Sequence, residues 1–383
     1  LAELAAAESL PPSGMPDMVE RLSVHRDTVW VFDDARIDAV AMADKLALLR
    51  DHAKRLERPS IATWNARWMD QHRDRRFVSS KGADIQHDYQ ECGFVLAFSM
   101  VDGPETVQER FLEAEHRFSD LIRLQSTHGK RIEETLDKCE VFLAGAKAVE
   151  PGMATVILSP EAAGIFAHES FGHKSEADFM LGDPSMLESW KIGTKVGSPI
   201  LSIVDSGRPF GSGYMPYDDE GQPAGETYLI RDGVLTGRLH NALTSTVLDE
   251  PVTGNARAIS FRYEPIVRMT TTTILPGTES RETLFSDVQD GYFIETVRHG
   301  SGMSTFTIAP GLSWRIRNGK IAEPVRVAVL TGTVFETLGE IDGLSDSVEV
   351  PFLVGGGCGK MEQWPLSVGF GGPYVRVRRM NLA

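Results

Sequence analysis

Long hydrophobic runs are missing from this sequence, and cysteine is scarce. No apolar stretch approaches the roughly 20 residues that a membrane-spanning helix needs, so we expect no membrane partner. Cysteine occurs three times, as Cys92, Cys139 and Cys358. An odd number of widely separated cysteines excludes a disulfide framework and favours a reducing compartment. Residues 1–7 also lack the basic segment of a secretory signal, so we expect a cytoplasmic protein.

Positive charge is also in deficit. Lysine and arginine number 39 against 54 aspartate and glutamate residues, which leaves a formal net charge of −15. Such a surface repels nucleic acid and anionic membranes, so we expect no nucleic acid as a partner. The hydrophobic fraction of 42% and the charged fraction of 24% are typical of globular domains. A chain of 383 residues is long enough for two of them.

The first predicted domain, residues 1–150, mixes strands and helices. Alternating apolar residues predict a strand within 22–32, and helical spacing predicts a helix over 41–56. Residues 61–69 and 76–86 are typical of a hairpin or meander that leads into an apolar strand at 92–100. We expect two helices to follow, at 104–124 and 132–148. Strands followed by helices indicate a sheet with helices on one face.

The second predicted domain, residues 151–383, begins after the breaker Glu150-Pro-Gly. A short buried strand at 153–159 should run directly into a helix. From 190 onward, β-rich runs are separated by Asp-Gly and Asn-Gly turns, and only 279–290 and 334–341 have a helical pattern. We therefore predict an α+β protein whose C-terminal domain is mainly antiparallel sheet, curled or barrel-like, with the helix that follows residue 159 set into it.

That helix carries the chemistry of the chain. Ser159 is a good N-cap and Pro160 suits the first helical position. His168, Glu169 and His173 follow, and two imidazoles beside a carboxylate are what a hydrolytic zinc site requires. The spacing is H-E-x-x-x-H, whereas the familiar zinc motif is H-E-x-x-H. Five residues place the two imidazoles about 140° apart on a straight α-helix.

Two local structures reconcile this spacing with one metal ion. Either a π-bulge absorbs one residue, or the helix ends near Gly172, whose flexible backbone lets His173 return from a loop. A catalytic zinc also needs a third protein ligand. Cys358 is one candidate, because glycines on both sides let a thiolate approach an ion closely, although a free cysteine is often simply buried. Glu176 is the alternative. For Asp218, Asp219 and Glu220 we predict a loop role.

Six blocks of the sequence occur in a characteristic order: HESFGHKSEAD at 168–178, YDDEGQP at 217–223, LHNAL at 239–243, TGNAR at 253–257, PIVRMT at 265–270 and GCGK at 357–360. In these blocks and their spacing the chain resembles the TldD branch of the TldD/PmbA (TldD/TldE) family of zinc metallopeptidases. The resemblance implies one Zn²⁺ held by His168, His173 and Cys358, with Glu169 as the general base. It also implies a homodimer, or a heterodimer with a paralogue that lacks the motif.

The chemistry predicts a peptidase. Zinc lowers the pKa of its water to about 7, and Glu169 would accept the proton. We expect unfolded or small peptides to bind by strand addition, with weak sequence specificity, along an edge formed by residues 257–273. The alternative for this stretch is an ordinary interior strand. The candidate substrate-binding residues are Tyr263, Arg268, His240 and Arg262. Two alternatives remain: a thiol hydrolase that uses Cys358 with a histidine, and a catalytically silent peptide-binding subunit with a structural metal.

Overall fold

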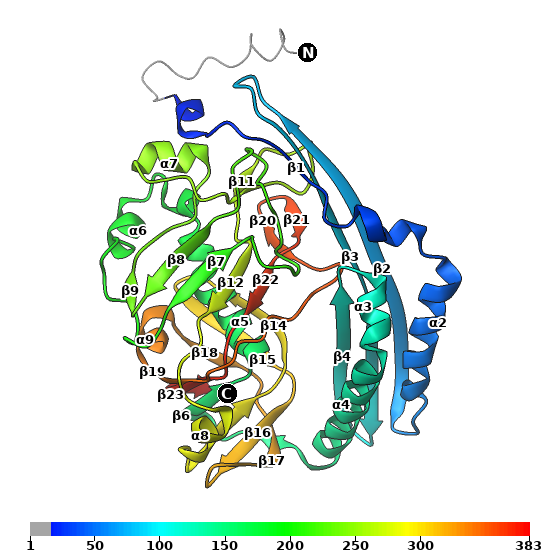
Figure 1. The fold of residues 1–383 in the computed structure, drawn as a ribbon. Helices are drawn as coiled ribbons and strands as arrows, with labels where there is room; N and C mark the ends of the chain where they lie inside the picture. Colours follow the sequence, from blue (N-terminus) through cyan, green and yellow to red (C-terminus); the bar gives the residue numbers. More distant parts are fainter. Residues whose placement is uncertain (1–16) are drawn as a thin grey trace.

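The computed structural model describes residues 17–383 (Figure 1). The expectation about residues 1–7 lies outside this range. Within the described residues, no helix has both the length and the apolar character needed to cross a membrane. The mixed architecture with a curled sheet confirms the predicted α+β class. The boundary near residue 150 stays a prediction.

A long twisted sheet forms the N-terminal part. Its strands are β1 (Arg26–Val29), β2 (Ile61–Val78), β3 (Asp84–Asp102) and β4 (Glu105–Glu115). The central strand is β3, which pairs in parallel with β1 and antiparallel with β2 and β4. The predicted hairpin or meander is therefore a single hairpin of 18-residue and 19-residue strands, and the apolar run at 92–100 is the second half of β3.

The prediction of a helix over residues 104–124 is wrong. Residues 105–115 form β4, which pairs along its whole length with β3. A two-residue turn at Gly103-Pro104 explains the difference, because Gly103 has a φ of 56°, which favours glycine and reverses the chain. The helices of this part are α2 (Met42–Ala53), α3 (Phe118–Arg123) and α4 (Gln125–Gly145).

The two faces of this sheet have different neighbours. Phe94, Leu96 and Phe98 of β3 are buried against α2 and α4, which cover the outer side of the sheet in Figure 1. The opposite face, which we call the inner face, carries the odd-numbered residues of β2 and β3 and the even-numbered residues of β4. It meets the C-terminal part, where Arg75 forms an ion pair with Asp219 at 2.9 Å.

A ten-stranded sheet dominates the C-terminal part. Its path is β14-β15-β18-β23-β6-β13-β16-β17-β5, with β19 beside β23, and only the β6–β13 and β5–β17 pairs are parallel. The strands are β5 (Lys147–Ala148), β6 (Gly152–Leu158), β13 (Asp290–Ile294), β14 (Val297–Gly302), β15 (Thr305–Pro310), β16 (Ser313–Arg317), β17 (Lys320–Arg326), β18 (Leu330–Thr333), β19 (Ile341–Leu344) and β23 (Val375–Leu382). Strand β6 is the predicted strand that leads into the motif helix.

A five-stranded sheet lies against the first, in the order β22-β12-β7-β8-β9. Its strands are β7 (Ile203–Ser206), β8 (Glu226–Arg231), β9 (Val234–Leu235), β12 (Thr271–Ile274) and β22 (Gly369–Gly371). Two small ladders complete the β-structure: β10 (Ala256–Arg257) with β11 (Ile266–Val267), and β20 (Cys358–Lys360) with β21 (Gln363–Leu366).

The predicted edge strand at 257–273 is also wrong. Strands β10 and β11 are two residues each, the intervening residues form a loop, and β12 lies between β22 and β7 in the interior of its sheet. Asp205 holds β12 there, because its carboxylate accepts hydrogen bonds from the hydroxyls of Thr270 and Thr272.

The remaining helices are short. The predicted segments 279–290 and 334–341 contain α8 (Arg281–Ser286) and α9 (Val334–Gly339), and α6 (Pro184–Ser189) lies ahead of them. The pattern missed α7 (Ala242–Leu248), which is rich in threonine and serine. Asn241 stabilises the start of α7, because it forms a capping box with Thr244.

Candidate metal centre

The motif helix α5 (Pro160–Ala167) occupies the middle of the C-terminal part (Figure 1). Ser159 caps it, since its Oγ accepts a hydrogen bond from the amide of Ala162 at 3.1 Å. One side of α5 touches β22: a methyl group at Gly164 would lie 2.5 Å from the amide nitrogen of Gly371. The next turn touches β14 of the larger sheet. The helix end is therefore fixed between the two sheets.

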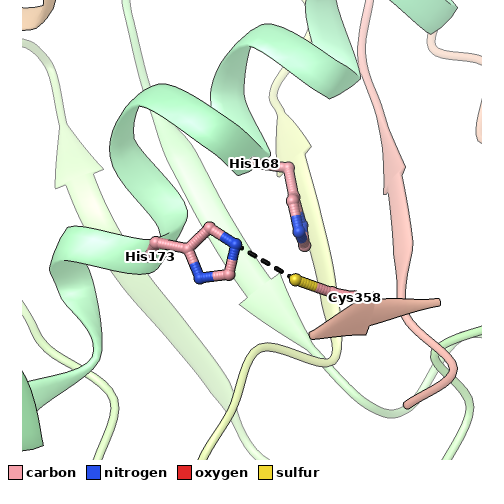
Figure 2. A group of neighbouring side chains, drawn as sticks. All are labelled: His168, His173 and Cys358. Atoms are coloured by element: carbon pink, nitrogen blue, oxygen red, sulfur yellow. Dashed lines mark hydrogen bonds between the residues drawn. The ribbon is translucent and has the colours of Figure 1, made fainter. Parts of the chain in front are cut away.

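A π-helix at His168–Gly172 follows α5 without a break. The amide of His173 donates to the carbonyl of His168, five residues back, so one additional residue fits into this turn. Residues five apart then take the relative positions that residues four apart have in an α-helix. Of the two structures that the spacing allowed, the π-bulge is confirmed, and both imidazoles lie on one side of the helix (Figure 2).

Three donor atoms meet beside this turn. The ring centroids of His168 and His173 are 5.0 Å apart, and Cys358 Sγ lies 3.0 Å from His173 Nε2. One donor atom from each residue lies within 4.8 Å of the other two. Donors of a tetrahedral zinc site are about 3.3–3.6 Å apart, as follows from zinc–nitrogen and zinc–sulfur bond lengths. Small side-chain adjustments bring the three atoms to that spacing, so the set fits a zinc ion.

Two glycines allow the close packing that positions these donor residues. A methyl group at Gly172 would lie 2.1 Å from Met269 Sδ, whereas the φ of Gly172 is an ordinary helical −57°. The expectation that Gly172 supplies backbone freedom is therefore wrong, and its role is space. A methyl group at Gly357 would lie 2.2 Å from the carbonyl oxygen of Leu366, so β20 can approach β21 and bring Cys358 to the histidines.

The protonation of the two imidazoles differs. Burial keeps the pKa of His168 well below its usual value, so the ring is neutral, as a metal ligand must be. Its buried Nδ1 has no hydrogen-bond partner among the described residues. Burial also acts to lower the pKa of His173, but the hydrogen bonds to Cys358 and Glu176 outweigh it and raise this pKa to about 10. A metal at Nε2 would displace that proton.

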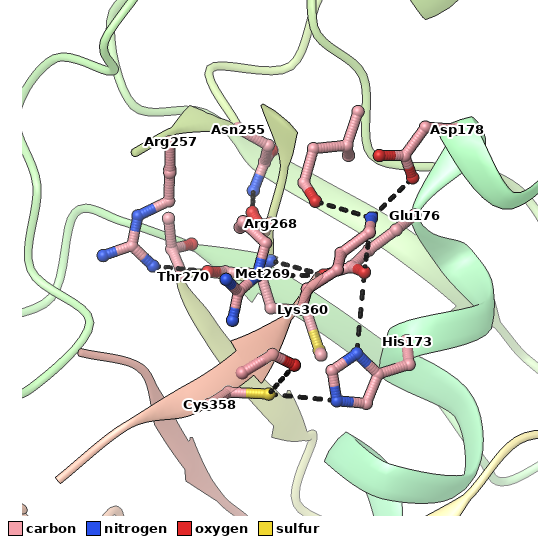
Figure 3. A network of polar contacts seen from close by, with 12 residues as sticks. His173, Glu176, Asp178, Asn255, Arg257, Arg268, Met269, Thr270, Cys358 and Lys360 are labelled. Atoms are coloured by element: carbon pink, nitrogen blue, oxygen red, sulfur yellow. Dashed lines mark hydrogen bonds and ion pairs between the residues drawn. The ribbon is translucent and has the colours of Figure 1, made fainter. Parts of the chain in front are cut away.

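A buried polar network supports His173 from behind (Figure 3). Glu176 is fully buried, and its Oε2 lies 3.5 Å from His173 Nδ1. The Nζ of Lys360 donates to Glu176 at 2.9 Å, to Asp178 at 2.6 Å and to the carbonyl of Val267 at 2.9 Å. Burial alone would raise the pKa of Glu176, but His173 and Lys360 lower it to about 2. The carboxylate of Glu176 therefore orients His173 from behind rather than joining the donors.

Lys360 connects strand β20, which carries Cys358, with the helical segment that carries His173 and Glu176. It lies two residues after Cys358 on β20, and both side chains reach the helical segment that carries the histidines: Cys358 Sγ contacts His173, and Lys360 Nζ donates to Glu176. Sequence reasoning assigned no role to Lys360. The Cys-x-Lys spacing on a strand was the available signal, but its buried partners Glu176 and Asp178 are far away in the chain and only folding reveals them.

Replacing Lys360 with methionine is expected to weaken metal binding by about 10–100-fold, as loss of a group that supports a ligand usually does. Breaking a buried ion pair should also cost about 3–5 kcal/mol of stability. Urea denaturation and competition with a chromophoric chelator measure the two effects. The double variant Lys360→Met, Glu176→Gln should recover stability because the unpaired charge of Glu176 is removed. Unchanged metal affinity in the folded single variant would contradict this role.

Glu169 lies beside the donor group. Its carboxylate Oε2 is 3.9 Å from His173 Nε2, and its side chain is 23% exposed. Burial raises its pKa, although the positive charge of His173 opposes this. Strand β14 lies directly over it: a methyl group at Gly300 would lie 3.0 Å from Glu169 Cγ, and one at Gly302 would lie 2.7 Å from its carbonyl oxygen. The side chain and backbone of Glu169 therefore pack closely against β14.

The other predicted site residues are dispersed. Arg268 is buried near the donors, with Nε 3.8 Å from Glu176 Oε1. His240 is also buried, but its Nε2 binds Glu250 at 2.9 Å and it does not join the donor group. Tyr263 and Arg262 belong to the loop between β10 and β11, and Tyr263 is half-exposed. Their part in substrate binding stays a prediction. Asp218 organises a loop, as predicted, by accepting hydrogen bonds from nearby backbone amides.

Comparisons with known proteins agree with this geometry. Residues 151–383 match the family model described as the PmbA/TldA metallopeptidase C-terminal domain. A Synechocystis protein named a metalloprotease is 35% identical over 345 residues, which cover 88% of this chain and 73% of the relative. A Saccharolobus solfataricus protein named a zinc metalloprotease TldD homolog is 29% identical over 335 residues, or 85% of this chain and 72% of the relative.

Other relatives are considerably longer than the matched part. A Methanothermobacter thermautotrophicus metalloprotease is 34% identical over 304 residues, which cover 79% of this chain and 61% of the relative. The structure of TldE from Thermococcus kodakarensis superimposes with a TM-score of 0.70 at 15% identity, over 100% of this chain and 82% of that one, which shows a shared fold. Together with the matched C-terminal domain, these similarities show that the chain belongs to the TldD/PmbA family of metallopeptidases.

Proposed function

We propose that this chain is a zinc-dependent peptidase that hydrolyses unfolded or small peptides with weak sequence specificity. One observation carries the proposal: donor atoms of His168, His173 and Cys358 converge within 4.8 Å, and the carboxylate of Glu169 lies 3.9 Å from Nε2 of His173. Two imidazoles and a thiolate leave one of four tetrahedral positions for water or substrate. A structural zinc site is normally closed by a fourth protein ligand, whereas the donor group found among residues 17–383 contains these three residues and no fourth.

Each residue has a definite task in this reaction. A bound zinc ion supplies Lewis-acid chemistry, since it activates water and polarises a carbonyl group. His168, His173 and Cys358 would hold the ion, and Glu176 would keep Nε2 of His173 directed at it. Glu169 accepts a proton from the attacking water and passes it to the leaving amine, and its raised pKa suits both steps.

Substrate is expected to bind along β14 instead of residues 257–273. Strand β14 ends the path of the ten-stranded sheet, and no strand in residues 17–383 pairs with its outer side. Arg298, His299 and Ser301 are exposed there, while Gly300 packs on Glu169. An extended peptide that adds to this edge would pass Glu169 and be held mainly through its backbone. Backbone recognition explains both the weak sequence specificity and the need for an unfolded substrate.

A chelator experiment tests the proposal. Hydrolysis of an unstructured fluorogenic peptide should stop after treatment with a zinc chelator and return when zinc is added back. A thiol hydrolase is the second candidate, and the 3.0 Å contact between Cys358 Sγ and His173 Nε2 is the observation that favours it. Activity that survives chelation but is lost on alkylation of Cys358 would establish the thiol mechanism and overturn ours. The whole enzyme is further proposed to be cytoplasmic, as a homodimer or with a paralogue that lacks the motif.

A further inference from the structure

A cavity of about 440 Å³ lies where the N-terminal sheet faces the start of β14. One wall consists of β2, β3 and β4, where Asn65, Ala97 and Arg110 are paired in register. The opposite wall is formed by Val297 and Arg298 of β14. The cavity therefore borders the same outer strand that packs on Glu169.

The charge of this cavity is opposite to that of the protein as a whole. The chain has a net charge of −15, yet Arg110 and Arg298 both line the cavity. Arg67 is exposed on the same inner face, two residues along β2 from Asn65. Within residues 17–383, none of these three arginines forms an ion pair. Guanidinium groups without such a partner are available to a carboxylate ligand.

The one acidic residue of the lining does not cancel this charge. Glu109 already accepts hydrogen bonds from the Thr296 hydroxyl at 2.8 Å and from the amide of Arg110 at 2.9 Å. Burial raises the pKa of Glu109, which disfavours its charged form. Both carboxylate oxygens thus accept from neutral donors, and no arginine side chain lies within ion-pair distance of them among residues 17–383. The rest of the lining consists of the neutral polar residues Thr63, Asn65, Ser99 and Gln108 and the aromatic residues Trp64 and Phe98.

The distance along β14 connects the cavity with the reaction. Arg298 lines the cavity, whereas Gly300 and Gly302 pack on Glu169. Two to four residues of strand span about 7–14 Å. A substrate strand paired with β14 would therefore place a side chain in the cavity when the peptide bond at Glu169 lies two to four residues away.

We propose that this arginine-lined cavity is a specificity subsite that binds a carboxylate of the peptide substrate, two to four residues from the bond that is cleaved. The inference rests on the proposed function and refines it: recognition of the backbone is weakly selective, but acidic peptides are preferred. The carboxylate is that of an aspartate or glutamate side chain or that of the peptide C-terminus. Both carry the same planar anion, which suits a guanidinium group.

Peptide binding to the Glu169→Gln variant, saturated with zinc, tests the subsite without requiring turnover. The probes are rhodamine-labelled decapeptides of alanine and serine with glutamate at two central positions, the matched glutamine peptide, and each with a free or amidated C-terminus. We expect the glutamate peptide to bind about tenfold more tightly by fluorescence anisotropy, in line with hydrogen bonds to charged groups. A preference that follows the free C-terminus instead assigns the subsite to chain ends and also supports it.

Substitutions identify the groups responsible. The double variant Arg110→Ala, Arg298→Ala should bind glutamate and glutamine peptides equally, while Arg110→Glu, Arg298→Glu should reverse the preference toward a lysine peptide. Arg317→Ala is the matched control, because Arg317 is exposed on β16 and already pairs with Glu323. Equal binding of all peptides by the zinc-saturated Glu169→Gln protein, or a preference that survives the double alanine substitution, would overturn the proposal.

The subsite and the proposed function fail in different ways. The assignment as a zinc peptidase fails if chelation does not affect hydrolysis or if no hydrolysis occurs. The subsite stands in either case, provided that the acidic preference depends on Arg110 and Arg298. If hydrolysis depends on zinc but the preference is absent, the subsite alone fails. In an active enzyme, the double alanine variant should raise KM for the glutamate peptide with little change in kcat, because the subsite lies away from the reacting atoms.

Discussion

Replacing Glu169 with glutamine is expected to lower kcat for peptide hydrolysis by about 10²–10⁴-fold, the usual contribution of a general base. Glutamine keeps the size of the side chain and its packing under β14, but it cannot accept a proton. Because Glu169 is not among the three donors, the variant should retain its metal. Steady-state kinetics on a fluorogenic peptide, with metal content measured on the same sample, separates the two effects.

Glu188→Gln is a suitable control for this experiment. Glu188 lies on α6 and is exposed, with only a weak 3.8 Å contact to Lys191, so its removal should leave both hydrolysis and metal content unchanged. If Glu169→Gln hydrolyses peptide at the parental rate, no general base acts at this position. Absence of hydrolysis in the metal-loaded parent protein would instead favour the silent subunit with a structural metal, for which an intact Glu169 has no use.

Replacing Cys358 with alanine is expected to reduce metal affinity by more than about 100-fold, because loss of a ligand should exceed the 10–100-fold effect of losing a supporting residue. Hydrolysis should be lost with the metal. The fold should survive, since Cys358 lies on a two-stranded ladder at the border of the site and is only partly buried. Metal content after dialysis and thermal unfolding provide the two readouts.

The other cysteines supply the matched control. Cys92 and Cys139 are fully buried, and burial raises the pKa of Cys92 to about 12 and that of Cys139 even more strongly, so both are thiols that pack as small apolar groups. Cys139→Ala should lower stability through lost packing but leave the metal bound. Metal loss in Cys139→Ala, or full retention in Cys358→Ala, would contradict the assignment.

The features of the fold and the site that were predictable from the sequence are those that depend on residues close together in the chain. The start of α5 was predictable because its cap, its first-turn proline and the preceding strand are adjacent in sequence. The five-residue spacing of the histidines pointed to a helix irregularity, and local backbone geometry resolved it as a π-helix. Cys358 was identified by its glycine neighbours together with a family resemblance, since spacing alone could not exclude Glu176.

Non-local pairing explains what was missed. Residues 105–115 have mixed apolar and charged positions that fit a helix as well as a strand, and their pairing with β3 decides between the two. The edge at β14 could not be predicted either, because an edge is a property of strand order in the whole sheet. The bonds from Lys360 to Glu176 and Asp178 depend on the same long-range arrangement.

X-ray absorption at the zinc edge of the purified, zinc-loaded protein tests the central claim most directly. We predict a four-coordinate first shell with two imidazole nitrogens at about 2.0–2.1 Å, one sulfur at about 2.3 Å and one further light atom from water. The sulfur contribution should disappear in Cys358→Ser. A shell without sulfur in the parent protein, or one that retains sulfur in Cys358→Ser, would contradict a metal centre built from His168, His173 and Cys358.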